Sequence, residues 1–151
     1  MTKFLSLDPG GTTGYAIIEH DEYDFELIES GQIQYGLEGF VDTWLGGAFG
    51  SPDYVVCESF TLREGIYGAD LSPVYIIGAL EALVMAESGS EEPIRIHYQE
   101  PKLKPLCDDE RLKKLGLHQK GKPHRNDAVR HGIIHLRNIK HKPTLVAGWK
   151  E

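Results

Sequence analysis

The chain has 151 residues, of which 40% are hydrophobic and 26% are charged, an ordinary balance for a globular protein. No apolar run approaches the roughly 20 residues that span a bilayer, and the two cysteines, Cys57 and Cys107, form no CxxC pair. These features exclude a membrane-spanning chain and a disulfide-rich secreted one. Because the N-terminus runs straight into a motif at Asp8, we expect no signal peptide. We predict a cytoplasmic protein with one domain over residues 1–140 and a C-terminal tail over residues 141–151.

The net charge of −7 conceals a segregation of charge along the chain. Residues 1–101 carry 18 acidic and 3 basic side chains, whereas residues 102–142 carry 12 basic and 4 acidic ones and five histidines. This asymmetry indicates that the basic segment binds a polyanion such as DNA, although a solvated helix face rich in lysine has the same signature. The candidate phosphate contacts are Lys102, Lys104, Lys120, Lys122 and Arg125.

The first half of the chain reads as strands and one helix. Residues 4–7 and 15–18 are apolar runs separated by a Pro-Gly-Gly turn, and residues 25–33 alternate roughly in polarity, so we predict a three-stranded antiparallel meander. Apolar residues recur at helical spacing over residues 37–45, before a Gly-Gly pair. The continuous apolar run of residues 53–57 predicts a buried strand that leads into Glu58.

The second half alternates between helices and strands. Ser72-Pro73 offers a capping serine and a first-turn proline, which predict the start of the longest helix, ending near residue 88. Residues 94–98 form a further strand, and residues 110–117 a further helix. After a basic loop, a last helix starts at Arg125 or Asn126 and ends at Arg137. This order of elements indicates a mixed α/β sheet.

Three acidic residues hold special places in this layout. Asp8 ends the first strand, Glu58 ends the central buried strand, and Asp127 lies in the first turn of the last helix. Carboxylates at the ends of neighbouring strands converge on one edge of a sheet, and their oxygens are the usual ligands of Mg²⁺ and Mn²⁺. Two such ions about 4 Å apart activate water and stabilise the leaving oxygen in phosphodiester hydrolysis. Each acid also has a structural interpretation, as a turn cap, an exposed strand end or a partner of the helix dipole.

Four segments match, in order and spacing, the motifs of one known family. Residues 5–17 read LSLDPGGTTGYAI, residues 55–60 read VVCESF, residues 101–104 read PKLK and residues 122–128 read KPHRNDA. Together they resemble the RuvC-type Holliday-junction resolvases. That family opens with Asp-Pro-Gly before a second strand, and its closing motif has an aspartate or a histidine three positions before a final Asp-Ala pair. His124 holds that earlier position here.

The resemblance implies a ribonuclease H-like fold, an α/β fold in which a five-stranded mixed sheet, its first three strands antiparallel, is flanked by helices. It implies that Asp8, Glu58, His124 and Asp127 form the catalytic site and bind two Mg²⁺ or Mn²⁺ ions, with His124 as a ligand or a water-positioning group. It also implies a homodimer that nicks four-way DNA junctions, and possible action on other branched DNA, as for the short members carried by phages. Phe60 is the candidate for the family's junction-contacting aromatic residue.

The last helix departs from the family, which is usually alanine-rich after Asp-Ala, because residues 129–135 read VRHGIIH. His131 and His135, with His124 and Asp127, could form a zinc-binding face. No glutamate follows the first histidine, so we predict surface or half-buried positions for His131 and His135 instead. In the glycine-containing loop before the longest helix, Ile66-Tyr67 are candidate wedges for a DNA junction.

Three other functions share parts of this pattern. The hairpin of residues 8–14 is similar to the phosphate-binding hairpin of the actin, sugar-kinase and Hsp70 group, which needs two such domains around ATP, whereas 151 residues supply one. The related nucleases that process ribosomal RNA precursors share the fold and the acid pattern, so only a comparison of substrates separates them. The third alternative is a non-catalytic DNA-binding module, which has no need of clustered acids beside phosphates.

Overall fold

The structure is a computed structural model that describes residues 1–62, 68–87 and 92–150. Within these residues the centre is a five-stranded sheet in the order β3-β2-β1-β4-β5. The strands are β1 (Thr2–Asp8), β2 (Thr13–His20), β3 (Phe25–Ile33), β4 (Tyr54–Glu58) and β5 (Arg95–Gln99). The first three strands are antiparallel, whereas β4 runs parallel to both β1 and β5. The predicted mixed sheet is therefore confirmed.

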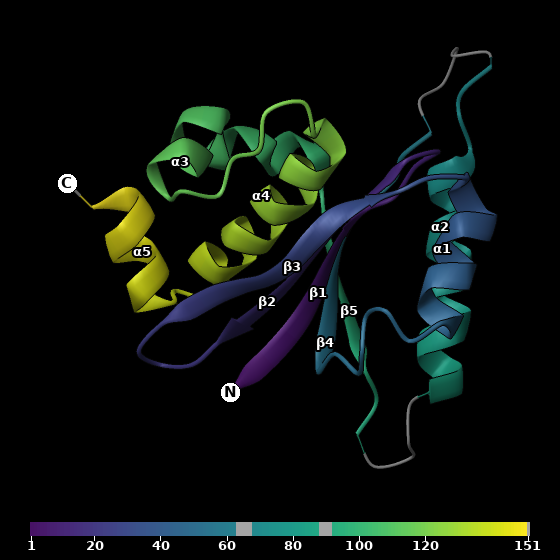
Figure 1. Cartoon of the computed structure of the whole chain (residues 1–151), viewed down its shortest axis with the longest axis horizontal. Helices are drawn as coiled ribbons and strands as arrows, with labels where there is room; N and C mark the ends of the chain where they lie inside the picture. The colour runs from purple at the N-terminus through teal and green to yellow at the C-terminus, as the bar shows by residue number, and fades with distance from the viewer. Residues whose placement is uncertain (63–67, 88–91, 151) are drawn as a thin grey trace.

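Helices cover both faces of this sheet (Figure 1). The helices α1 (Gly36–Leu45) and α2 (Ser72–Glu87) pack on one face, and α4 (Pro123–Asn138) packs on the other. A 3-10 helix, η1 (Pro101–Cys107), and α3 (Asp109–Lys114) lead from β5 to the α4 side, where α5 (Lys142–Trp149) lies beside α4. Within the described ranges no helix has both the length and the apolar character needed to cross a bilayer.

The two faces of β1 build two separate cores. Successive residues of a strand point to opposite faces, so Leu5 and Leu7 face α1 and α2, whereas Phe4 faces α4. All three side chains are fully buried, as is Cys57 of β4, which confirms the prediction that Cys57 belongs to the core. Packing on both faces leaves β1 little freedom to move, so Asp8 at its end is held by a rigid element.

Helix α4 approaches the sheet closely because small residues line the contact. The Ser6 hydroxyl donates to the backbone carbonyl of Ala128 at 2.6 Å. A side chain at Gly132 would place its Cβ 2.5 Å from Ile18 Cδ1, and one at Gly14 would place its Cβ 1.8 Å from the His124 carbonyl oxygen. Gly14 therefore permits the first turn of α4 to lie directly against β2, and Gly132 permits the middle of the helix to do so.

Several elements differ from the sequence prediction. Helix α3 ends at Lys114, three residues before the predicted end at residue 117, and η1 was not predicted. Helix α4 begins at Pro123, two residues before the earliest predicted start, because a proline suits the first turn of a helix. Asp127 consequently lies beyond the first turn, where the helix dipole contributes little to its role. In the segment predicted as a tail, residues 142–149 form α5, and its Trp149 packs against the α4 core.

Candidate active site

The ends of β1 and β4 bring two acids together. These strands pair in parallel with Leu7 opposite Cys57, so Asp8 and Glu58, one residue further along, lie side by side at the same edge of the sheet. Their side chains are only 11% and 14% exposed. Parallel pairing therefore produces a buried, close pair of carboxyl groups at the place that the strand-end positions predicted.

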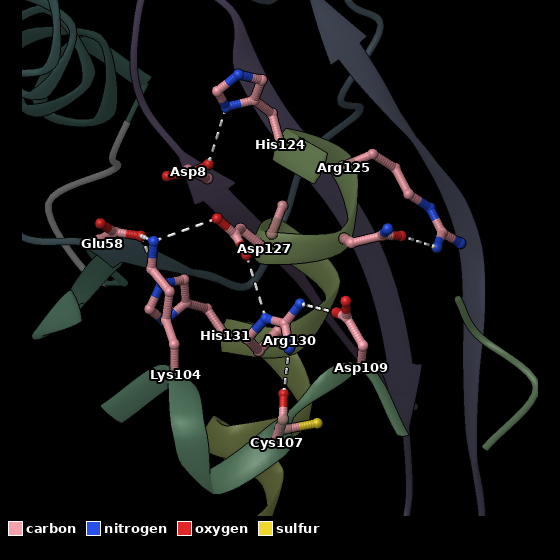
Figure 2. Close-up of polar contacts among 12 residues, drawn as sticks. Asp8, Glu58, Lys104, Cys107, Asp109, His124, Arg125, Asp127, Arg130 and His131 are labelled. Carbon is pink, nitrogen blue, oxygen red and sulfur yellow. Dashed lines mark hydrogen bonds and ion pairs between the residues drawn. The ribbon is translucent and has the colours of Figure 1, made fainter. Parts of the chain in front are cut away.

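Helix α4 adds His124 and Asp127 to the same edge of the sheet (Figure 2). The two residues lie three apart and therefore on one face of the helix, and His124 Nδ1 is 3.4 Å from Asp8 Oδ2. The backbone N–H groups of His124 and Arg125 both donate to the side-chain oxygen of Gln32 on β3. This tertiary cap satisfies the first free N–H groups of α4 and fixes its start beside Asp8.

An ammonium group lies among the carboxylates. Helix η1 places Lys104 Nζ 3.2 Å from Glu58 Oε2 and 3.2 Å from Asp127 Oδ2, as Figure 2 shows. The Lys104 side chain is 31% exposed. We predicted Lys104 as a phosphate contact, and in this structure its charge instead offsets that of two acids.

The like charges at this edge oppose the ionisation of Asp8. Burial, the neighbouring Glu58 carboxylate and Asp127 raise the pKa of Asp8 to about 8, and Lys104 offsets only part of this effect. Burial also opposes the ionisation of Glu58, but the hydrogen bond and charge of His131 and the charge of Lys104 outweigh it, so the pKa of Glu58 lies below its usual value. The pair of carboxyl groups therefore keeps its proton on Asp8 near neutral pH.

Arg130 holds the Asp127 carboxylate, a role that we did not predict from the sequence. Its Nε donates to Asp127 Oδ1 at 3.1 Å, and its other nitrogens donate to Asp109 Oδ1 and to the carbonyl of Cys107. The guanidinium is thus anchored on three sides, with its side chain only 9% exposed. Asp127 Oδ1 is held in place, and Asp127 Oδ2 faces Lys104.

His131 holds Glu58 in a similar way, and its predicted position was wrong. Its side chain is fully buried, and its Nε2 lies 2.7 Å from Glu58 Oε2. Residues three and four positions along a helix return to nearly the same face, so the positions of Arg130 and His131 relative to Asp127 are the sequence signal that could have identified them. Polar residues at these positions are also compatible with an exposed helix face, whereas α4 is buried on most sides.

His135 points away from the carboxylates. It is half-buried as predicted, and its Nε2 lies 3.0 Å from the hydroxyl of Tyr54. His131 and His135 therefore do not share a zinc-binding face with His124 and Asp127.

The donor set fits a divalent cation by its chemistry. Within the part of the chain that the structure describes, no three His, Cys, Asp or Glu side chains surround one ion position in this arrangement. Lys104 Nζ lies between Glu58 and Asp127. Three carboxylates are nevertheless hard oxygen donors of the kind that Mg²⁺ and Mn²⁺ prefer, and the single charge of Lys104 is fewer than the three that they carry when ionised.

The predicted DNA contacts differ in their accessibility. Lys120 and Lys122 are exposed in the loop before α4, and Lys102 is exposed beside Glu100, with its Nζ 2.8 Å from Glu100 Oε2. Phe60 is half-buried and follows Glu58 by two residues. The predicted wedge at residues 66–67 lies outside the described residues.

Arg125 requires a correction. The residue is only 3% exposed, and its guanidinium donates to Ser30 Oγ, to the carbonyl of Leu117 and to Asn126 Oδ1. Since these bonds turn the side chain inward, it ties the loop before α4 to β3 and is not presented to a DNA phosphate.

Solved structures with this architecture include Holliday-junction resolvases. Thermus thermophilus RuvC in complex with a Holliday junction substrate has 14% sequence identity and a TM-score of 0.64, over 95% of this chain and 98% of that one. The fowlpox virus resolvase in complex with Holliday junction DNA has 13% identity and a TM-score of 0.61, over 89% of this chain and 99% of that one. No protein-family model and no curated protein sequence match the chain. The chain therefore has the ribonuclease H-like fold that RuvC and the fowlpox virus Holliday-junction resolvase share.

Proposed function

We propose that the protein is a metal-dependent endonuclease that cleaves four-way junctions and related branched DNA. The observation that carries this proposal is the convergence of Asp8, Glu58 and Asp127 at one sheet edge, in a fold whose solved examples include resolvases bound to junction DNA. A binding module gains nothing from such a cluster, because buried carboxylates repel phosphates and destabilise the fold unless a cation compensates them.

The residues at this edge of the sheet would have different roles in the reaction. Bound Mg²⁺ or Mn²⁺, as one or two ions, would supply a Lewis acid that activates water and stabilises the leaving oxygen. Asp8, Glu58 and Asp127 would hold it. His124, whose side chain is 47% exposed and lies 3.4 Å from Asp8, is placed to bind an ion or to orient a water molecule. Lys104, released from the carboxylates, would remain within reach of the phosphate at the same edge.

The exposed lysines near this edge would position the DNA backbone. Lys122 immediately precedes α4 and lies two residues from His124, so a phosphate bound to Lys122 would lie near the carboxylates. Lys102 belongs to η1, the same short helix that carries Lys104. Such contacts set the register of the DNA without reading its sequence.

A symmetric pair of nicks requires two active sites, and we propose a homodimer that pairs through α2. This helix exposes Val74, Tyr75 and Met85 at 44%, 57% and 76%, while its Ile76 and Leu80 are fully buried in the core. Exposed apolar side chains gathered on one helix mark an interaction surface, and a second copy of the same helix offers matching chemistry.

Cleavage of a labelled four-way junction tests the proposal. The junction is compared with a linear duplex of the same sequence and with single-stranded RNA, in Mg²⁺, Mn²⁺ or chelator. We expect paired nicks in the junction, loss of cleavage with chelator, and loss of cleavage in Asp8→Asn with junction binding kept or tightened. This change removes a metal ligand, and it also removes the negative charge that Asp8 would carry once a bound ion displaced its proton. Cleavage of the RNA alone would favour a nuclease for RNA precursors. No cleavage together with stabilisation by ATP would favour the nucleotide-binding alternative.

A further inference from the structure

His131 is a fully buried polar residue in direct contact with one of the proposed metal ligands. Its Nε2 lies 2.7 Å from Glu58 Oε2, and its Nδ1 lies 2.5 Å from Gln99 Oε1. Gln99 is itself only 6% exposed and stands opposite Glu58 in the pairing of β4 with β5. The three side chains therefore form a short buried chain of contacts that ends at the carboxylate.

A backbone contact fixes the orientation of the Gln99 amide. Gln99 Nε2 donates to the backbone carbonyl of His131, so the Gln99 oxygen is the atom that faces Nδ1 of the ring. Glu58 as a carboxylate can only accept, so His131 Nε2–H donates to Glu58 Oε2. Both ring nitrogens of this buried histidine therefore lie within hydrogen-bond distance of a polar partner, Glu58 on one side and Gln99 on the other.

This arrangement restricts the rotation of the Glu58 side chain. Oε2 is the oxygen that accepts from His131, which leaves Oε1 as the oxygen without this contact. The restraint is stiff because β4, β5 and α4 carry the three residues and all pack into the core. Removing a residue that hydrogen-bonds to a metal ligand and orients it commonly lowers metal affinity or activity 10- to 100-fold.

We propose that His131, braced by Gln99, is a positioning residue that fixes the Glu58 carboxylate for binding a divalent cation. The proposal rests on the metal-dependent function proposed above and deepens it. A purely structural histidine would fill the same volume and would affect folding, but it would not affect cation binding in a protein that remains folded. The two roles are therefore separable by experiment.

Helix α4 offers a matched control one turn further along. His135 is also a histidine of this helix with buried contacts, but its ring contacts Tyr54 and Phe4, which lie away from the carboxylate edge. His131→Leu and His135→Leu make the same chemical change in the same helix. His131→Gln keeps an N–H donor near the position of Nε2 and so restores the bond to Glu58 alone.

The experiment measures Mn²⁺ binding to the full chain by electron paramagnetic resonance of the free ion, after circular dichroism has shown that each variant is folded. We expect His131→Leu to lower Mn²⁺ affinity about 10- to 100-fold, His131→Gln to recover most of that loss, and His135→Leu to keep wild-type affinity. Junction binding in chelator should be unchanged in all three, and the cleavage defect of His131→Leu should diminish at high Mn²⁺ concentration.

Wild-type Mn²⁺ affinity in folded His131→Leu would overturn the positioning role, and so would equal losses in His131→Leu and His135→Leu. Should His131→Leu fail to fold, Gln99→Leu takes its place, since it keeps the ring and removes only its brace. Loss of Mn²⁺ affinity in Gln99→Leu would then support the proposal, and wild-type affinity would overturn it. A wild-type protein that neither binds Mn²⁺ nor cleaves the junction would refute the proposed function itself, a result distinct from all of these.

Discussion

Asp8→Asn should stabilise the fold while it abolishes cleavage. Asp8 is 8% exposed, and burial together with the Glu58 and Asp127 carboxylates raises its pKa from 3.8 to about 8. A carboxyl group whose pKa is higher in the folded than in the unfolded state costs stability as the pH rises from 3.8 towards 8, because folding must retain a proton that the unfolded chain releases. Asparagine removes this cost, since it resembles the protonated acid in shape and carries no charge.

The size of the gain follows from the same shift. Between pH 3.8 and pH 7, the raised pKa of Asp8 lowers the free energy of unfolding by about 1.4 kcal/mol per pH unit. The total is about 4 kcal/mol. Because the titrations of Asp8 and Glu58 depend on each other, we expect a gain of about 2 to 4 kcal/mol at pH 7, less than half of that at pH 5, and almost none near pH 4. A gain of this size raises Tm by roughly 5 to 10 °C in a domain of this length.

Urea unfolding of wild type and Asp8→Asn, followed by tryptophan fluorescence at pH 7 and pH 5 in chelator, measures this difference. Asp42→Asn serves as the control, because Asp42 is an exposed acid on α1 and its replacement should change stability by less than about 0.5 kcal/mol. No gain at pH 7 would refute the reasoning. An equal gain at both pH values would show that the stabilisation does not come from the charge on Asp8.

Three further predictions concern charge and pH. Lys122→Glu should weaken junction binding and lower the slope of log affinity against log salt by about one; an unchanged slope would remove Lys122 from the DNA contacts. The apparent affinity for Mn²⁺ should rise with pH up to about 8, because the ion displaces the proton that burial and Glu58 keep on Asp8; calorimetry in two buffers measures the released proton. Burial, His97 and His20 lower the pKa of His135 from 6.5 to about 4. As the pH drops from 6.5 to about 4, His135 therefore binds a proton in the unfolded chain but not in the folded one, and the free energy of unfolding should fall. After a discount for partial exposure this loss is about 2 kcal/mol, and urea unfolding should show a flatter profile in His135→Phe.

Local chemistry in the sequence was sufficient to predict the sheet and most helices. The first-turn proline Pro73 of α2 and the apolar run before Glu58 encode their elements directly, because both depend on neighbouring residues. The predicted capping role of Ser72 was wrong, since Ser72 is the first residue of the helix and its backbone N–H donates to Asp70 Oδ1. The start of α4 could not be predicted in this way. Its first free N–H groups are capped by Gln32, which is 92 and 93 residues away from its partners.

The sequence by itself determined which acids stand at strand ends and therefore that Asp8 and Glu58 could meet. Only the tertiary structure decided what surrounds them. It turned Arg125 inward, placed Lys104 between two carboxylates, and buried Arg130 and His131 beneath them. The physical reason is that a strand-end position follows from local periodicity, whereas the partners of a buried charge come from whichever distant segments the packing brings within hydrogen-bond distance.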